Sequence, residues 1–216
     1  MSQATLWFAH GWAYDASFWA PLRAALSDWP QVADDAGYFG VPRLPEVSGP
    51  VIAIGHSLGV LRLLRQPPPG CAGLVCINGF ARFGAGPDFP EGVAPRLLDR
   101  MLRQLAAQPQ AVVRDFRARC GDDTPSGAPD MAALERGLLA LRDEDRRAGL
   151  AALPMPALAL AGAEDPVVPP AMTGAALPGV ALRWHARGGH LLPRSDPQWC
   201  AGHIRDFALG LAGIGA

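Results

Sequence analysis

The stretch Gly55-His56-Ser57-Leu58-Gly59 constrains the fold of this sequence more than any other. It follows a short apolar run at residues 51–54 that is bounded by proline and glycine, the pattern of a buried parallel strand. From residue 57 to residue 65 the apolar residues recur with helical spacing. A Gly-x-Ser-x-Gly sequence between a strand and a helix is typical of a nucleophilic serine on a strained turn, whose glycines let strand and helix pass closely. We therefore predict that Ser57 is a nucleophile; the alternative is a turn of no chemical consequence.

The rest of the chain alternates between strand-like and helix-like segments, which predicts an α/β fold with a mostly parallel sheet and helices on both faces. Strands are predicted at residues 5–9, 31–33, 51–54, 74–77, 157–161 and 180–184, and helices at 17–26, 57–65 and 197–212. Between residues 80 and 153 the strand signals disappear, and helices are predicted near 93–107, 109–119, 130–142 and 143–152. We therefore predict a core made of residues 1–79 and 154–216, with a helical cap inserted at 80–153.

A serine hydroxyl is a poor nucleophile at neutral pH, so it needs a base beside it and an acid that orients the base. Where the serine sits on a strand-to-helix turn of this kind, the acid and then the histidine follow on later loops. Asp165 comes just after the predicted strand at 157–161, and His190 follows the strand at 180–184 in Gly188-Gly189-His190. Their order and their placement on loops predict that Ser57, Asp165 and His190 form a catalytic triad.

Other residues compete for these roles less well. Glu164 precedes Asp165, but the Asp-Pro-Val-Val-Pro run that starts at residue 165 is more typical of the acid loop. His185 lies in or beside its strand and His203 has helical neighbours, so we expect both to be packed or solvated. We expect His56 to point away from the serine, because successive side chains of an extended segment alternate.

Acyl transfer from an ester also needs two N–H donors for the oxyanion that forms. We predict that these are the backbone N–H groups of Leu58, which follows the nucleophile, and of Trp12 in His10-Gly11-Trp12. Gly11 permits a close approach of the backbone, and the Trp12 indole either walls an acyl pocket or packs in the core. We expect His10 to form structural hydrogen bonds; in the plainer alternative, His10-Gly11 simply ends a strand.

Taken together, these features resemble the α/β-hydrolase family over nearly the whole chain. Within that family the sequence is most similar to the pimeloyl-[acyl-carrier-protein] methyl ester esterases of biotin synthesis. The similarity lies in His10-Gly11-Trp12, in residues 88–93 with the helices after them, and in Leu153-Pro154-Met155-Pro156. This resemblance implies a serine carboxylesterase that acts on the methyl ester of a carrier-linked dicarboxylate.

The sequence departs from the family pattern in two places. The family begins with an antiparallel strand pair, whereas only residues 1–4 precede the first predicted strand here. A helix is usual before the strand that leads to the serine, but residues 37–50 are rich in proline and glycine and predict no full helix. The triad loops belong to the opposite, carboxyl edge of the strands, so we expect the triad to be intact even if the substrate pocket is altered.

Charge and composition narrow the range of partners. Half of the 216 residues are hydrophobic and 18% are charged, with a formal net charge of −1, so no global field attracts nucleic acid or an anionic membrane. The histidines and cysteines lack His-Glu-x-x-His or Cys-x-x-Cys spacing, and no Gly-x-Gly-x-x-Gly loop is present. We therefore predict no metal and no cofactor. The four scattered cysteines and the absence of a long apolar span lead us to expect reduced thiols in a soluble, cytoplasmic protein.

The predicted cap is rich in arginine. Residues 91–119 contain six arginines and three acidic residues, which is a local excess of three positive charges. Arg96, Arg100 and Arg103 are spaced to share one helix face. Two interpretations stay open: a solvated face, or a surface that docks an acidic acyl carrier protein, which the resemblance suggests.

Two alternatives to the carrier-linked substrate also stay open. A small-molecule esterase, lactonase or thioesterase would use the same residues. A non-catalytic relative that binds a ligand under its cap belongs to a different class, but a pure binding protein has no need of Ser57, Asp165 and His190 together.

Overall fold

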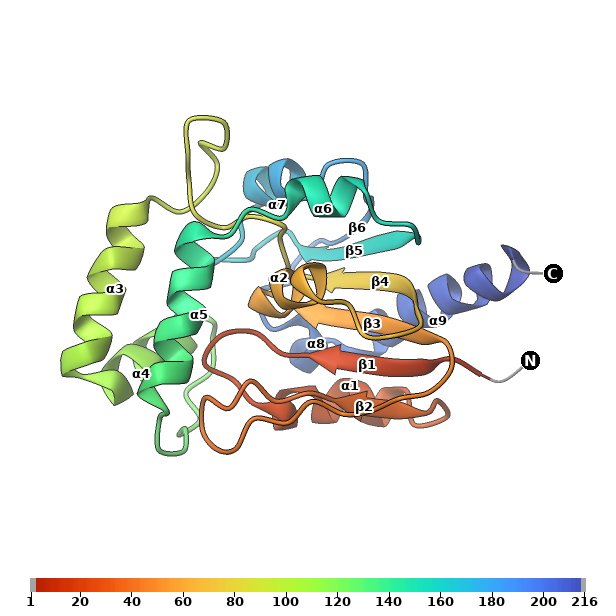
Figure 1. Cartoon of the computed structure of the whole chain (residues 1–216), viewed down its shortest axis with the longest axis horizontal. Helices are drawn as coiled ribbons and strands as arrows, with labels where there is room; N and C mark the ends of the chain where they lie inside the picture. The colour runs from red at the N-terminus through yellow and green to blue at the C-terminus, as the bar shows by residue number, and fades with distance from the viewer. Residues whose placement is uncertain (1–2, 215–216) are drawn as a thin grey trace.

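Six parallel strands form a single sheet in the order β2-β1-β3-β4-β5-β6. The computed structural model describes residues 3–214, with side chains described up to residue 211. The strands are β1 (Thr5–Ala9), β2 (Gln31–Ala33), β3 (Val51–His56), β4 (Cys71–Ile77), β5 (Ala157–Gly162) and β6 (Ala181–His185). All six strands predicted from the sequence are confirmed, with shifts of one to three residues at some ends. Because every strand runs the same way, their carboxyl ends share one edge of the sheet (Figure 1).

Successive side chains of a strand point to opposite faces of the sheet, and each face is covered by an apolar layer. Leu6 and Phe8 of β1 belong to one buried cluster with Leu22 of α1 (Ala20–Ala25) and Ile204 of α9 (Pro197–Ile214). Trp7 and its equivalents on β3 and β4 face the other way, where α2 (Leu58–Arg65) and α6 (Arg147–Ala151) cover the sheet. A strand buried on both faces reads as a continuous apolar run, which is why the sequence showed short, unbroken stretches.

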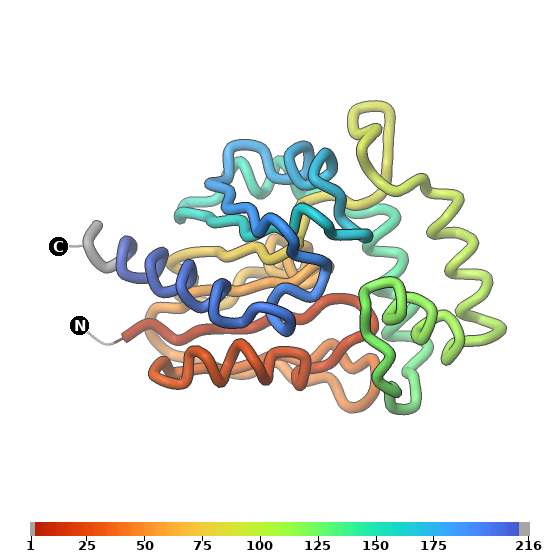
Figure 2. The backbone as a smooth tube through the Cα atoms, turned by 180° about the vertical axis from the view of Figure 1, so that it is seen from behind, coloured from red at the N-terminus to blue at the C-terminus, as the bar shows by residue number. Residues whose placement is uncertain are grey.

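The chain between β4 and β5 forms a helical insertion, residues 80–153. It contains α3 (Pro95–Ala107), α4 (Pro109–Arg119), α5 (Met131–Asp143) and α6. Figure 1 and the reverse view in Figure 2 show α3, α4 and α5 beyond the carboxyl ends of the strands, while α6 returns over the sheet. The sequence-based helix ranges agree with these bounds except at 143–152, where the helix is shorter and begins at Arg147.

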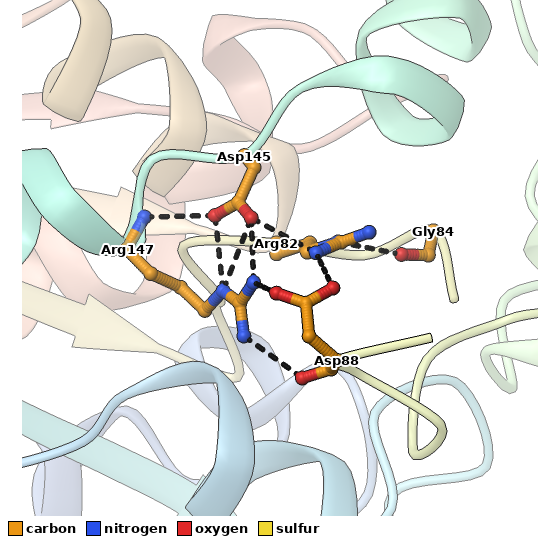
Figure 3. A network of polar contacts seen from close by, with 5 residues as sticks. All are labelled: Arg82, Gly84, Asp88, Asp145 and Arg147. Atoms are coloured by element: carbon orange, nitrogen blue, oxygen red, sulfur yellow. Dashed lines mark hydrogen bonds and ion pairs between the residues drawn. The ribbon is translucent and has the colours of Figure 1, made fainter. Parts of the chain in front are cut away.

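Ion pairs between arginine and aspartate connect the two chain segments that join this insertion to the sheet. Arg82 and Asp145 form an isolated antiparallel bridge, and Arg82 donates from Nη1 to Asp88 at 2.8 Å and to Asp145 at 2.9 Å. Arg147 donates to the same two carboxylates (Figure 3). Both guanidinium groups also lie over the Phe89 ring, at 5.5 Å and 5.4 Å from its centroid.

Three short helical elements differ from the predicted pattern. The helix expected at 17–26 is a 3₁₀ turn, η1 (Ala16–Trp19), followed by α1. The elements α7 (Pro170–Ala176) and α8 (Leu192–Ser195) were not predicted, because seven and four residues are too few to show a helical period. Residues 34–50 contain no helix, as the density of proline and glycine indicated.

Candidate active site

Ser57 stands between β3 and α2 in a strained backbone conformation, with φ 53° and ψ −124°. A non-glycine residue rarely adopts a positive φ, and it persists only where the surrounding structure enforces it. Gly59 explains part of that enforcement, since a Cβ at this position would lie 2.0 Å from the carbonyl oxygen of Ala9. The first turn of α2 is thereby pressed against the end of β1, and the serine is held at the carboxyl edge of the sheet.

Asp165 and His190 meet at this same edge. His190 Nδ1 lies 2.8 Å from Asp165 Oδ2, and both residues are almost completely buried. The other carboxylate oxygen, Oδ1, accepts hydrogen bonds from the N–H groups of Val167 (2.7 Å) and Val168 (2.9 Å). The carboxylate is therefore fixed at both oxygens. Glu164, the competing acid, has an exposed side chain.

The imidazole of His190 is left with one unused nitrogen. Its Nε2 atom is buried and has no hydrogen-bond partner within the described residues. Because Nδ1 donates to a carboxylate, Nε2 carries the lone pair that can accept a proton. This is the arrangement that a general base requires.

His56 makes its contacts with the His190 loop and with Phe18 of η1. Although it precedes Ser57, its ring lies 4.8 Å from the His190 ring, centroid to centroid, and 4.5 Å from that of Phe18. Its Nε2 is 2.8 Å from the carbonyl oxygen of His190, so this nitrogen is the donor. Complete burial, reinforced by repulsion from His190, holds the pKa of His56 well below its usual value and keeps it neutral. His56 therefore ties the chain next to the serine to the His190 loop.

The predicted oxyanion donors lie on segments that touch the serine. A Cβ on Gly11 would lie 3.0 Å from Ser57 Cβ, closer than ordinary van der Waals contact, so glycine favours this close approach of the loop before Trp12. Neither the Trp12 N–H nor the Leu58 N–H takes part in a hydrogen bond within the described part of the chain. Their role as oxyanion donors stays a prediction.

His10 and Trp12 have the structural roles that the sequence left partly open. Ala36 N–H donates to His10 Nε2 at 3.0 Å, so Nδ1 carries the proton and donates to the Gly11 carbonyl at 2.9 Å. The Trp12 indole is buried, donates to the carbonyl of Leu134 at 2.9 Å and meets Phe116 edge-on. It therefore packs between the core and the helical insertion.

The three arginines proposed for docking lie on α3. Arg96, Arg100 and Arg103 are exposed, and none of them has an ion-pair partner in the described structure. Leu97, beside them, is 49% exposed. Arg117, which the sequence-based count included in the same charge excess, is 6% exposed and belongs to the interior instead.

A crevice of about 490 Å³ is bordered by α2, α5 and residues 35–44. Leu58 lines it, so the crevice reaches the first turn of the helix that follows Ser57. Four arginines line its walls: Arg43, Arg62, Arg65 and Arg136.

Sequence reasoning missed two buried residues that touch this site. Asn78 follows β4 at the carboxyl edge and contacts the His190 loop. Arg117 reaches from α4 to the carbonyl of Ala13, next to Trp12. The Asn78-Gly79 pair after a strand was a weak signal for the first; no local pattern marks the second.

The described residues 3–214 hold no group of three or more His, Cys, Asp or Glu side chains arranged for a metal ion. Nor does this part of the chain contain a helix both long and apolar enough to cross a membrane.

Comparison with solved structures defines the class of the fold. The chain superposes on an esterase from Exiguobacterium antarcticum with a TM-score of 0.80 and 16% identity, covering 96% of this chain and 92% of that one. For a thermophilic esterase from Thermogutta terrifontis the TM-score is 0.78 at 18% identity, with coverage of 97% and 91%. At these identities the likeness concerns the fold alone, which is the α/β-hydrolase fold, as the sequence predicted.

Sequence comparison narrows this class. The chain matches no protein-family model. It is 30% identical to the pimeloyl-[acyl-carrier protein] methyl ester esterase of Stenotrophomonas maltophilia strain R551-3, over 94% of this chain and 92% of the relative. It is 29% identical to the enzyme of the same name from Aromatoleum aromaticum, over 97% and 100%. The chain belongs to the family of pimeloyl-[acyl-carrier protein] methyl ester esterases, which are carboxylic ester hydrolases.

Proposed function

We propose that the protein hydrolyses a carboxylic ester through an acyl intermediate on Ser57. The observation that carries this proposal is the buried pair of His190 and Asp165, 2.8 Å apart. Its imidazole keeps an unpartnered Nε2, and the ring lies 4.8 Å, centroid to centroid, from that of His56, the residue before the serine. The close approach of Gly11 to Ser57 adds the donors for an oxyanion. Membership of an esterase family agrees with this chemistry.

Each step assigns a proton to a named atom. His190 Nε2 takes the Ser57 hydroxyl proton as Oγ bonds to the ester carbonyl carbon. The N–H groups of Trp12 and Leu58 hold the resulting oxyanion. When the carbon–oxygen bond to the alcohol breaks, Nε2 returns the proton to the departing alcohol.

The acyl-serine is then hydrolysed by the reverse of these movements. Water gives a proton to His190 Nε2 as its oxygen attacks the acyl carbon, and Ser57 Oγ leaves with that proton. Asp165 keeps Nδ1 protonated and stabilises the imidazolium that forms in both halves of the reaction. The products are an alcohol and a carboxylic acid, and the chain's own residues carry every proton transfer.

The substrate that we propose is the methyl ester of pimeloyl-acyl-carrier protein, after the names of the relatives. Residues 1–79 and 154–216 form the catalytic core in this proposal, and residues 80–153 act as its cap. In this proposal the acyl chain occupies the crevice that is lined by Leu58, the residue after the serine. We assign the carrier protein to the exposed face of α3, which carries three unpaired arginines and the exposed Leu97, because carrier proteins of this kind are acidic and meet basic surfaces. Four free cysteines agree with a reducing, cytoplasmic location.

Two measurements test the catalytic proposal. A fluorophosphonate probe should label the wild type and not Ser57→Ala. The variant should lose turnover by a factor of roughly 10⁶ while staying folded, since only the nucleophile is removed. Ser57→Ala that kept more than about a tenth of the ester hydrolysis would show that the nucleophile lies elsewhere.

A charge-reversal experiment tests the carrier-docking proposal. Arg96→Glu, Arg100→Glu and Arg103→Glu together should lower kcat/KM for the carrier-bound methyl ester, and the wild-type preference for that substrate should shrink with added salt. Hydrolysis of a small free ester should stay the same, because the triad lies away from α3. Arg114→Glu, an exposed arginine on α4, is the matched control. Equal losses on both esters would mean that the helix was destabilised, and no loss on either would leave a small-molecule esterase as the better description.

A further inference from the structure

Asn78 occupies a special position at the end of β4. Its backbone N–H donates to the Leu160 carbonyl at 2.9 Å, which extends the pairing with β5 by one residue. Its φ of 45° lies in the left-handed region, which asparagine and glycine tolerate better than other residues. The residue is 1% exposed, so its side-chain amide is buried where an unbonded polar group would be costly.

The side chain of Asn78 joins two loops that are far apart in the sequence. Its Nδ2 lies 2.8 Å from the carbonyl oxygens of both Gly189 and His190, and its Oδ1 accepts from the N–H of Gly162 at 2.8 Å. These partners fix the orientation of the amide. If the amide were flipped, its oxygen would face the two carbonyl oxygens and its NH₂ group would face the N–H of Gly162.

These contacts place Asn78 between the two members of the buried pair. Gly162 begins the turn that carries Asp165, whereas Gly189 and His190 belong to the other loop. The carbonyl of His190 also accepts from His56 Nε2 at 2.8 Å, so two buried side chains hold the backbone of the same residue. The bond between His190 Nδ1 and Asp165 Oδ2 therefore closes a ring of hydrogen bonds that runs through the Asn78 amide.

We propose that Asn78 is a positioning residue that sets the placement of His190 relative to Asp165 and Ser57. The proposal rests on the catalytic roles given above. The Asn78 amide makes no contact with substrate in this role. It holds the backbone of His190, from which the imidazole projects. A displacement of about 1 Å in reacting groups is enough to cost on the order of 10²-fold in rate.

Two variants remove these bonds in different ways. Asn78→Gly deletes the side chain and tolerates the positive φ without strain. Asn78→Asp keeps the shape and the acceptor for Gly162 N–H, but an ionised carboxylate has no donor for the two carbonyl oxygens. Ile204→Ala, in α9, is the control for lost stability, because it removes buried apolar atoms and takes no part in the Asn78 hydrogen bonds.

The measurement is the hydrolysis of a small neutral ester by each full-length variant, well below its melting temperature. We expect kcat to fall by about 10- to 100-fold in both Asn78 variants, with KM within about threefold of the wild type, and kcat of Ile204→Ala to be unchanged. In Asn78→Asp the acid limb of the kcat/KM profile should also move to higher pH, because a nearby negative charge favours the imidazolium. The fall of kcat at nearly constant KM in folded Asn78→Gly, which adds no charge, is the result that a merely structural residue would not give.

Wild-type kcat in folded Asn78→Gly and Asn78→Asp would overturn the proposal, and so would failure of both variants to fold, which would assign Asn78 to the fold alone. Failure of the catalytic proposal itself appears differently, because Ser57→Ala would then keep its activity and its reaction with the fluorophosphonate probe.

Discussion

Arg117 offers the sharpest test of how the helical insertion supports the site. Its guanidinium group lies between two aromatic rings, 4.8 Å from the centroid of Tyr14 and 5.0 Å from that of Phe39. Nε donates to the carbonyl of Ala13 at 2.8 Å. Ala13 follows the predicted oxyanion donor Trp12 and has a φ of 60°, which costs a non-glycine residue about 1–2 kcal/mol. The buried cation therefore holds a strained turn in place.

The expected cost of Arg117→Met follows from these contacts. A hydrogen bond from a charged donor contributes about 1.5–3 kcal/mol, and each cation–π contact about 0.5–2 kcal/mol. Part of this lost stabilisation is offset, because folding of the variant no longer requires a guanidinium group to be dehydrated. Methionine also keeps apolar packing between the two rings. We therefore expect the free energy of unfolding to fall by about 2 kcal/mol.

The catalytic consequence is separate from the loss of stability. With the carbonyl of Ala13 released, the Trp12 N–H should be held less firmly. Complete loss of one oxyanion donor costs about 10²–10³ in kcat, so a loosened donor should cost about tenfold, with little change in KM.

Urea unfolding and steady-state kinetics on a small ester measure the two effects. Arg114→Met is the control, because Arg114 lies on the same helix with its side chain 70% exposed, and it should change stability by no more than about 0.5 kcal/mol. An Arg117→Met protein as stable and as active as the wild type would refute this reasoning, and a destabilised protein with wild-type kcat would refute the link to the oxyanion loop.

Three further predictions concern other parts of the molecule. Asp165→Asn should lower kcat by about 10⁴ because the amide favours the wrong imidazole tautomer, whereas Glu164→Gln should cost little; the reverse result in ester hydrolysis would exchange the two assignments. Gly137→Ala should lower the melting temperature, since its Cβ would lie 2.5 Å from Trp12 Cδ1, whereas Gly202→Ala in α9, with open space around the Cβ, should raise it. Hydrogen bonding to Arg147 lowers the pKa of Asp145 to about 2, so this pair stabilises the fold above the unfolded carboxyl pKa of about 4 and loses that effect as the pH falls towards 2. Melting curves of Arg147→Gln and the wild type should therefore differ most at neutral pH and converge between about pH 4 and pH 2, and a constant difference would speak against the ion pair.

The sequence by itself determined the features that depend on local pattern. Short apolar runs between breakers located all six strands, and the Gly-x-Ser-x-Gly sequence located the turn at Ser57, because strand burial and a strained turn each restrict residues close together in the chain. The order of strands and loops also sufficed to nominate Asp165 and His190. Parallel strands end at one edge, so residues after those strands gather there whatever their separation in sequence.

Only the tertiary structure decided what surrounds these residues. Asn78 contacts residues 84, 111 and 112 positions away, and Arg117 contacts Ala13 across 104 positions. In the sequence Arg117 looks like its exposed neighbours, because the aromatic rings that enclose it come from the core and not from α4. His56 likewise has its partners on the His190 loop. A buried hydrogen bond or cation–π contact depends on two segments meeting at a fixed distance and angle, and the packing of the helical insertion against the sheet sets that geometry.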